Sequence, residues 1–131
     1  MAAPNVVNVS SILGKTDVLD IDTVEAAITT NSVGSNKLYK INSLLVSNID
    51  GTNDADVSVD LFRANTAYYI AKTITVPAYS SLVALDKDYS VYLMEGDKLQ
   101  VQASASGLQA ICAYTIISDT SIALPGRPSI N

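Results

Sequence analysis

Two acidic runs, residues 17–22 and 50–56, carry carboxylates at spacings that a calcium site could use. Calcium takes roughly six to eight oxygen ligands, often from loops of this kind. Neither run has the glycine and the glutamate that an EF-hand loop places at fixed positions. Asp and Asn also form turns, because their side chains bond to nearby backbone N–H groups, so the turn interpretation is favoured and calcium binding stays open. The residues concerned are Asp17, Asp20, Asp22, Asp50, Asn53, Asp54 and Asp56.

Two further carboxylate pairs, Asp86 with Asp88 and Glu95 with Asp97, have side chains of the kind that a glycosidase uses. That chemistry needs two carboxyl groups set apart across a cleft. No feature of the sequence places such a cleft, and a chain with no Trp and one Phe lacks the usual stacking platforms for sugar rings. We therefore predict that these four residues are solvated carboxylates of turns.

The sequence contains no His and a single Cys, Cys112. His is the commonest general base and the commonest metal ligand, so its absence excludes the usual catalytic triads and the usual zinc sites. Cys112 lies in the apolar phase of the last expected strand, which predicts a buried core thiol. The sequence therefore predicts no catalytic residue, no metal and no cofactor, and favours a binding or structural role over catalysis.

The composition narrows the class of partner. The 131 residues suit one domain, and the net charge of −5 argues against nucleic acid, which needs a basic face. No apolar run approaches the ~20 residues of a membrane span. Charged residues make up 16% of the chain, against about 25% in an average domain. A polar but weakly charged surface favours a protein that works inside an assembly, although small β-sandwiches also tolerate such a surface.

The pattern of residues is typical of an all-β protein. Val, Ile, Thr and Tyr are frequent, and short alternating stretches are separated by turns roughly every 8–12 residues. Residues 56–62 give the cleanest alternation, with Val57, Val59 and Leu61 on one face and Ser58 and Asp60 on the other. We predict a single antiparallel β-sandwich, jelly-roll-like, of about seven or eight strands.

The expected organisation has three parts. Residues 1–13 form an N-terminal arm or edge strand, residues 14–118 form the sandwich core, and residues 119–131 form an extended C-terminal tail with Pro and Gly and no alternation. Residues 16–30 are ambiguous. They allow a short helix after a capping Asp or Thr, or two short strands joined by a turn, and the strands are favoured.

Three places offer candidate interface residues. The arm has the alternation to add a strand to a neighbouring sheet, the two adjacent tyrosines are of a type enriched at interfaces, and the tail holds an arginine that suits a carboxylate on a neighbour. Each feature has a competing interpretation. The arm is then an ordinary edge strand, the tyrosines are ordinary sheet residues, and the tail makes no contacts. The candidates are Val6, Val7, Val9, Tyr68, Tyr69, Leu124 and Arg127.

Five stretches carry a resemblance to a known class of protein. They are residues 9–15 (VSSILGK), 39–51 (YKINSLLVSNIDG), 70–78 (IAKTITVPA), 92–99 (YLMEGDKL) and 103–105 (ASA). Together they resemble small virion structural proteins of tailed phages, particularly those of cyanobacterial phages. The similarity extends over nearly the whole expected core, and the tail departs from it.

The resemblance implies a non-enzymatic virion component without cofactors. The first reading is a capsid decoration, or cement, protein that binds the outer head shell and bridges major capsid subunits, with a homotrimer as the favoured oligomer. The alternative is a tail, neck or fibre-associated protein that contacts other tail proteins or the host surface. A small enzyme or carbohydrate-binding module is the weakest reading, because His and Trp are absent.

Overall fold

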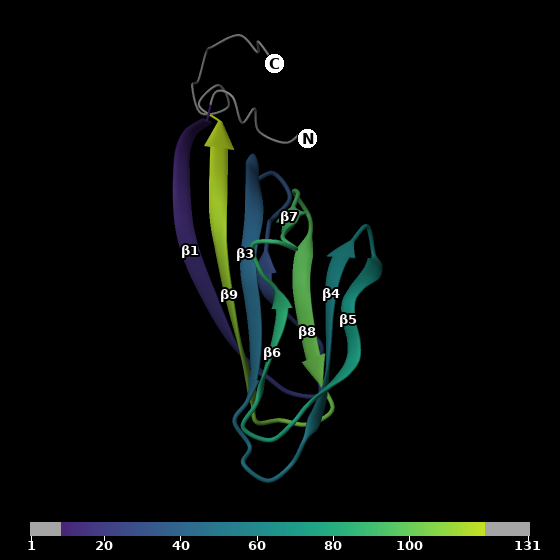
Figure 1. Ribbon diagram of the computed structural model, residues 1–131. Coiled ribbons are helices and arrows are strands. Elements are labelled where there is room, and N and C mark those ends of the chain that lie inside the picture. Colours follow the sequence, from purple (N-terminus) through teal and green to yellow (C-terminus); the bar gives the residue numbers. More distant parts are fainter. Residues whose placement is uncertain (1–8, 120–131) are drawn as a thin grey trace.

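The computed structural model describes residues 9–119, which form nine strands joined by turns and loops and contain no helix (Figure 1). The predicted all-β sandwich is confirmed, with more strands than the seven or eight expected. Within those residues no helix is long and apolar enough to cross a membrane. The strands are β1 (Val9–Ile21), β2 (Ala26–Thr30), β3 (Lys37–Asn48), β4 (Ala55–Arg63), β5 (Thr66–Val76), β6 (Ser81–Leu85), β7 (Val91–Leu93), β8 (Lys98–Ala103) and β9 (Leu108–Asp119).

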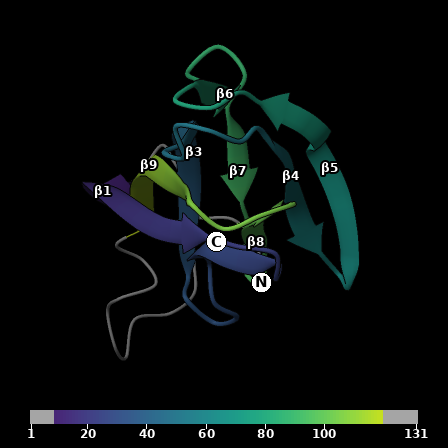
Figure 2. The same cartoon turned by 90° about the horizontal axis from the view of Figure 1, so that it is seen from below.

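The strands form two antiparallel sheets that we call sheet A and sheet B. Sheet A has the order β1-β9-β3-β6, with β7 also paired to β3, and sheet B has the order β2-β8-β4-β5. The chain crosses between the sheets repeatedly, and its last strand returns to lie beside its first. This order is jelly-roll-like, with β7 as an addition. It leaves β1 and β5 at outer edges of different sheets, and the view from below shows them on opposite sides of the molecule (Figure 2).

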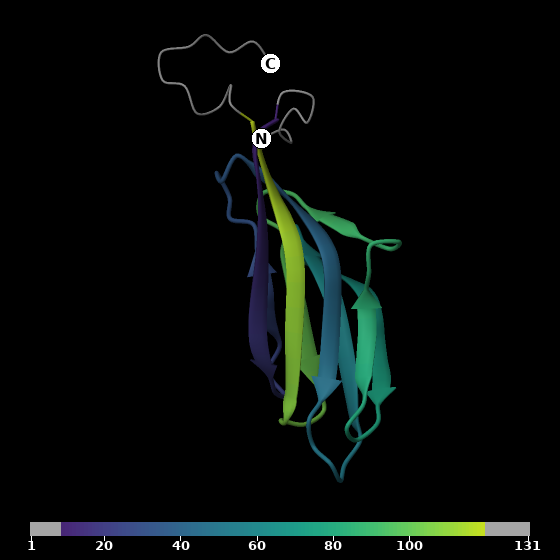
Figure 3. The ribbon, with the colours of Figure 1, turned by 60° about the vertical axis from the view of Figure 1, so that its left-hand side comes forward.

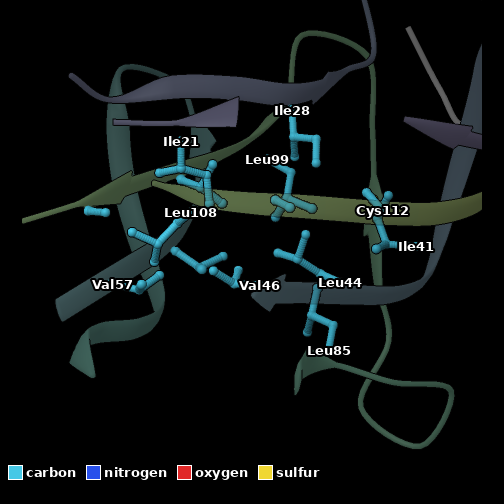
Figure 4. Close-up of a cluster of buried hydrophobic side chains, with 14 of the residues drawn as sticks. Ile21, Ile28, Ile41, Leu44, Val46, Val57, Leu85, Leu99, Leu108 and Cys112 are labelled. Atoms are coloured by element: carbon cyan, nitrogen blue, oxygen red, sulfur yellow. The ribbon is translucent and has the colours of Figure 1, made fainter. Parts of the chain in front are cut away.

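The core lies between the sheets and is filled by alternate residues of nearly every strand. Leu44, Leu99 and Cys112 have no exposed surface, and they lie among the apolar side chains drawn in Figure 4. Each buried Leu or Val contributes about 1.5–3 kcal/mol relative to an exposed one. The largest fully buried apolar side chains are Ile41, Leu44, Leu93, Leu99, Leu108, Val46, Val57, Val59, Val76 and Val101.

The ambiguous segment of residues 16–30 is strand, turn and strand. β1 continues to Ile21, residues 22–25 turn, and β2 begins at Ala26. The helix alternative is therefore wrong. The Asp22 carboxylate accepts a hydrogen bond from the backbone N–H of Val24 at 2.8 Å, and it forms a turn in place of a helix cap.

β1 is continuous across the expected boundary between residues 13 and 14. It pairs with β9 without a register shift from Ser11, opposite Ser118, to Ile21, opposite Leu108. Figure 3 shows β1 at the edge of sheet A with β9 beside it. Residues 9–13 therefore belong to the same long edge strand as residues 14–21.

Candidate functional site

The predicted interface residues fall into three groups. Val9 is the first residue of β1, where it lies opposite Asp119. Tyr68 and Tyr69 lie on β5, at the edge of the other sheet. The structure therefore does not bring Val9 and the tyrosines together. The remaining candidates, Val6, Val7, Leu124 and Arg127, lie outside the described residues.

The two tyrosines belong to an irregular hairpin. Tyr68 is 56% exposed and Tyr69 is 48% exposed, on opposite faces of β5. The Nζ atom of Lys72 lies 4.3 Å from the centre of the Tyr69 ring, a cation–π contact. The turn before them uses Ala64 and Asn65 with positive φ, as the tight turns between antiparallel strands require.

Apolar side chains form a row straight across the solvent-facing side of sheet A. Val18 on β1 lies opposite Ile111 on β9, Ile111 opposite Leu45 on β3, and Leu45 opposite Val83 on β6. Their exposed fractions are 72%, 45%, 37% and 56% in that order. We call these four residues the outer apolar row. Because contiguous exposed apolar surfaces are where proteins make contacts with partners, this row is a candidate contact site.

A shallow depression of about 390 Å³ lies beside this row, between β1 and β9. Within it the Gln109 amide donates a hydrogen bond to Asp20 Oδ1 at 3.2 Å. The depression is lined by Val18, Leu19, Asp20, Gln109, Ala110 and Ile111. Its mixed apolar and polar lining suits a protein surface better than a small ligand, which needs a deeper enclosure.

The inner side of β1 carries one carboxylate that is held in place. Asp17 Oδ2 accepts hydrogen bonds from the Tyr114 hydroxyl at 2.8 Å and from Thr29 Oγ1 at 3.0 Å. Burial and the neighbouring Asp17 carboxylate both raise the pKa of Tyr114, so its hydroxyl stays a donor. Two residues earlier in the strand, Lys15 is exposed. A fixed negative charge and an exposed positive charge therefore share one edge.

Asp60 is buried although it alternates with the core residues Val57 and Val59. It lies on the expected face of β4, yet it has no exposed surface, and its Oδ1 atom has no hydrogen-bond partner among the described residues. With its amide nitrogen turned toward the acids, Gln100 donates to Asp60 Oδ2 at 3.1 Å and to Glu25 Oε1 at 3.2 Å. Burial, followed by the nearby Glu25, raises the pKa of Asp60 to about 7. The Asp60 carboxyl is therefore protonated at mildly acidic pH.

Asp97 also departs from the expectation of a solvated turn. It is 2% exposed, and its carboxylate is 2.6 Å from the Arg63 guanidinium, with further contacts from Arg63 Nε. The same carboxylate accepts the backbone N–H of Met94 at 2.7 Å. Glu95 accepts the backbone N–H groups of Gly34 at 3.1 Å and Asn36 at 2.8 Å. Both acids join separate loops to one end of the sandwich.

Other acidic residues act as turn formers. Asp50 Oδ1 accepts the backbone N–H groups of Thr52 and Asn53, and these bonds lower the pKa of Asp50. Asp86 Oδ1 accepts the N–H groups of Asp88 and Tyr89. Within residues 9–119, no group of three or more His, Cys, Asp or Glu side chains is placed to hold a metal ion.

Cys112 is a buried core thiol, as predicted. It has no exposed surface, and burial raises its pKa to about 11. A thiol with a raised pKa is a poor nucleophile, because the thiolate is the reactive form. Cys112 therefore contributes to packing.

Sequence reasoning missed the outer apolar row, the burial of Asp60 and the ion pair of Asp97. For the row the sequence does hold a signal, since Leu45 and Ile111 are apolar residues in the outward phase of their strands. Only the register between strands reveals that these residues are neighbours. The surroundings of Asp60 and Asp97 come from Glu25 and Arg63, which are distant in sequence, and no local pattern indicates such contacts.

No protein-family model matches the chain, and no curated protein matches it. Among solved structures, it is similar to a chain of the acid-stable capsid structure of Helicobacter pylori bacteriophage KHP30. The TM-score is 0.52 at 8% identity, over 83% of this chain and 89% of that chain. At an identity this low, the structural similarity shows a shared fold alone.

Two further solved structures are also similar, with TM-scores below 0.5. A protein of the Bacillus endospore appendages, which are disulfide-linked pili, gives a TM-score of 0.49 at 16% identity, over 83% of this chain and 89% of that chain. A pentameric capsid protein isolated from metagenomic phage sequences gives 0.45 at 19% identity, over 80% of this chain and 64% of that chain.

Proposed function

We propose that this chain is a non-enzymatic structural protein of a phage virion. The observation that carries the proposal is the outer apolar row, which exposes Val18, Ile111, Leu45 and Val83 in register across one sheet. A protein that works alone gains nothing from such a surface, whereas a protein in an assembly covers it. The sequence resemblance to virion proteins and the fold shared with a phage capsid chain support the same role.

Within the virion, the role we propose is that of a capsid decoration, or cement, protein. It binds the outer head shell and bridges major capsid subunits, so many small contacts resist the outward pressure of the packaged genome. As a closed homotrimer it buries weakly charged surfaces between copies. The contacts assigned to neighbours are Val6, Val7, Val9, Tyr68, Tyr69, Leu124 and Arg127.

A tail, neck or fibre-associated protein is the second candidate. It is favoured by one specific feature, the exposed Tyr68 and Tyr69 on the edge strand β5. Tyrosine combines a large apolar ring with a polar tip, which suits a protein or host surface. In this reading β5, rather than the outer apolar row, makes the important contact.

The copy number of this chain in purified particles separates the two. Quantitative mass spectrometry measures it against the major capsid protein of the same particles. We expect a count comparable to that of the capsid subunits. A handful of copies moves the protein to the neck or tail, and its absence from particles contradicts a virion role altogether.

A further inference from the structure

β1 is a long strand with one free edge. Its pairing with β9 runs from Ser11 to Ile21 with no shift in register. Among residues 9–119, no strand is paired with the other edge of β1 (Figure 3). A long, regular and partly apolar edge presents a row of backbone donors and acceptors to another strand, and proteins normally block such an edge with bulges or short strands.

The side chains along β1 are complementary to the same strand turned around. When an antiparallel copy is placed with Thr16 opposite Thr16, Lys15 falls opposite Asp17 of that copy. In the same register Leu13 falls opposite Leu19. Both matches occur twice, because the two-fold axis repeats them. All four residues lie on the inner face of the sheet, since side chains alternate along a strand.

Neighbouring registers lose this match. The two-fold axis is perpendicular to the sheet, so the inner face of one copy continues into the inner face of the other. Odd-numbered residues therefore lie opposite odd-numbered residues, and even-numbered residues opposite even-numbered ones. A shift in one direction sets Lys15 against Lys15, and a shift in the other sets Asp17 against Asp17. Like charges directly opposite each other are destabilising, whereas opposite charges and apolar pairs stabilise.

Burial within one copy agrees with the same register. Leu13 is 58% exposed although it points to the inner face, and Leu19 packs only partly against the core. In the paired arrangement, Leu13 of one copy is covered by Leu19 of the other copy. Asp17 already has a fixed position through Tyr114 and Thr29, so it presents a preorganised partner to the free Lys15 of the other copy.

We propose that β1 pairs antiparallel with β1 of a second copy of this chain, with Thr16 on the two-fold axis. The contact joins sheet A of both copies into one continuous sheet. It deepens the proposed role in an assembly, on which it rests. It joins copies in pairs, so it is separate from any three-fold ring, and it links such rings to each other.

Cysteine cross-linking tests the register directly. In the full-length Thr16→Cys variant the two new thiols face each other, within the Cα separation that a disulfide allows. Under mild oxidation we expect a covalent dimer, seen as a doubling of mass on a non-reducing gel. Cys112 does not interfere, because it is buried.

Val18→Cys is the matched control on the same face of β1. In the proposed register Val18 lies opposite Gly14 of the second copy, so the two new thiols are about 13 Å apart along the strand. That distance is beyond the reach of a disulfide. We expect no covalent dimer for this variant.

The outcomes decide the proposal. Cross-linking of Thr16→Cys alone supports it, whereas equal cross-linking of both variants, or of neither, overturns it. Wild-type protein that stays monomeric in sedimentation at high concentration also overturns it. The proposed virion role is tested separately by the copy number in particles, so failure of one is distinguishable from failure of the other.

A charge reversal gives a second test of the proposed contact, and it needs no added cysteine. Lys15→Glu replaces attraction by repulsion in both charged pairs, so we expect the dissociation constant of the dimer to rise about tenfold. Lys87→Glu, in the exposed turn after β6, makes the same change of net charge away from β1. An equal effect of both variants contradicts the proposed contact.

Discussion

The two outer edges formed by β1 and β5 are built differently. From Ser11 to Ile21, β1 pairs with β9 in unbroken register, and it exposes apolar side chains on both faces, Ile12 and Val18 on one and Leu13 on the other. β5 pairs with β4 through two register shifts, and Thr73 beside them has a left-handed φ of 54°. A bulged strand twists away from a would-be partner. The comparison teaches that exposed large side chains do not by themselves prepare an edge for main-chain pairing with another strand, because that pairing also needs a regular backbone.

The irregularity of β5 has a local cause in β4. The Thr73 backbone N–H donates to Ser58 Oγ at 2.9 Å, in place of a backbone carbonyl of the neighbouring strand. Lys72 then projects from the bulged segment and lies over Tyr69. A charged lysine and a bulge are two devices that protect an edge from unwanted pairing. The tyrosines of β5 therefore offer side-chain contacts, while β1 offers main-chain hydrogen bonds.

The largest expected effect is at the turn end of the β4–β5 hairpin, where Arg63 is the last residue of β4. Arg63→Ala removes the guanidinium from the buried Asp97 carboxylate, which then keeps one backbone donor, from Met94. Because an unpaired buried charge is costly and Arg63 itself is half exposed, we expect a loss of about 2–3 kcal/mol in the free energy of unfolding. Urea denaturation measures it. Arg63→Lys is the control, since it keeps the charge and loses the bidentate geometry, and a loss below about 0.5 kcal/mol for Arg63→Ala contradicts the account.

Stability should also depend on pH through Asp60. Its pKa in the folded protein is about 7, above the unfolded value of 3.8, so the folded state holds a proton that the unfolded state releases. The contribution of Asp60 to the free energy of unfolding is therefore fully present below pH 3.8 and is lost as pH rises through 7. Between pH 5 and pH 8 we expect a fall of roughly 2–3 kcal/mol.

Asp60→Asn is the matched variant for this dependence. It keeps the size of the side chain and cannot ionise, so its stability should vary much less between pH 5 and pH 8. The measurement is the denaturation midpoint at several pH values. An unchanged pH dependence in the variant would assign the effect to another group. Because Asp60 lies opposite Tyr69, the effect concerns the β5 side of the molecule.

A smaller effect is expected on the β1 side. Tyr114→Phe removes the hydroxyl that donates to Asp17 at 2.8 Å and keeps the ring, which stacks on Tyr39. Asp17 keeps its hydrogen bond from Thr29. We expect a loss of about 1–1.5 kcal/mol in the free energy of unfolding. A loss as large as that of Arg63→Ala would show that the β1 edge depends on this bond more than the geometry indicates.

The smallest effect on stability should come from the outer apolar row. Ile111→Ser changes a side chain that is 45% exposed, so the free energy of unfolding should fall by less than about 1 kcal/mol. If the row is a contact surface, the same variant should weaken binding to purified particles that lack the native protein. Unchanged binding would remove the row from the interface.

The sequence predicted most of the fold because alternation is a local property. Val57 and Val59 on β4, and Leu99 and Val101 on β8, are buried in the phase that the pattern indicates. The position of the chain's turns followed from Asp, Asn and Gly, whose conformational preferences are equally local. Leu61 is only partly buried, because β4 pairs here with the exposed strand β5.

The surfaces could not be predicted in the same way, because they depend on which strands are neighbours. Val18 and Ile111 are 93 positions apart, and only the pairing of β1 with β9 brings them together. Asp60 looked like an outward residue by phase, and its burial depends on Glu25 and Gln100 from two other strands or turns. Non-local register decides such sites, and alternation within one strand carries no information about it.

Amide hydrogen exchange at two protein concentrations tests the contrast between the two edges most directly. At low concentration the outward backbone amides of both β1 and β5 should exchange quickly, because no strand of residues 9–119 pairs with either outer edge. At high concentration we predict slower exchange confined to residues 12–20 of β1, with residues 66–76 of β5 unchanged. Slowing in β5 instead of β1, or no change in either strand, would contradict the account.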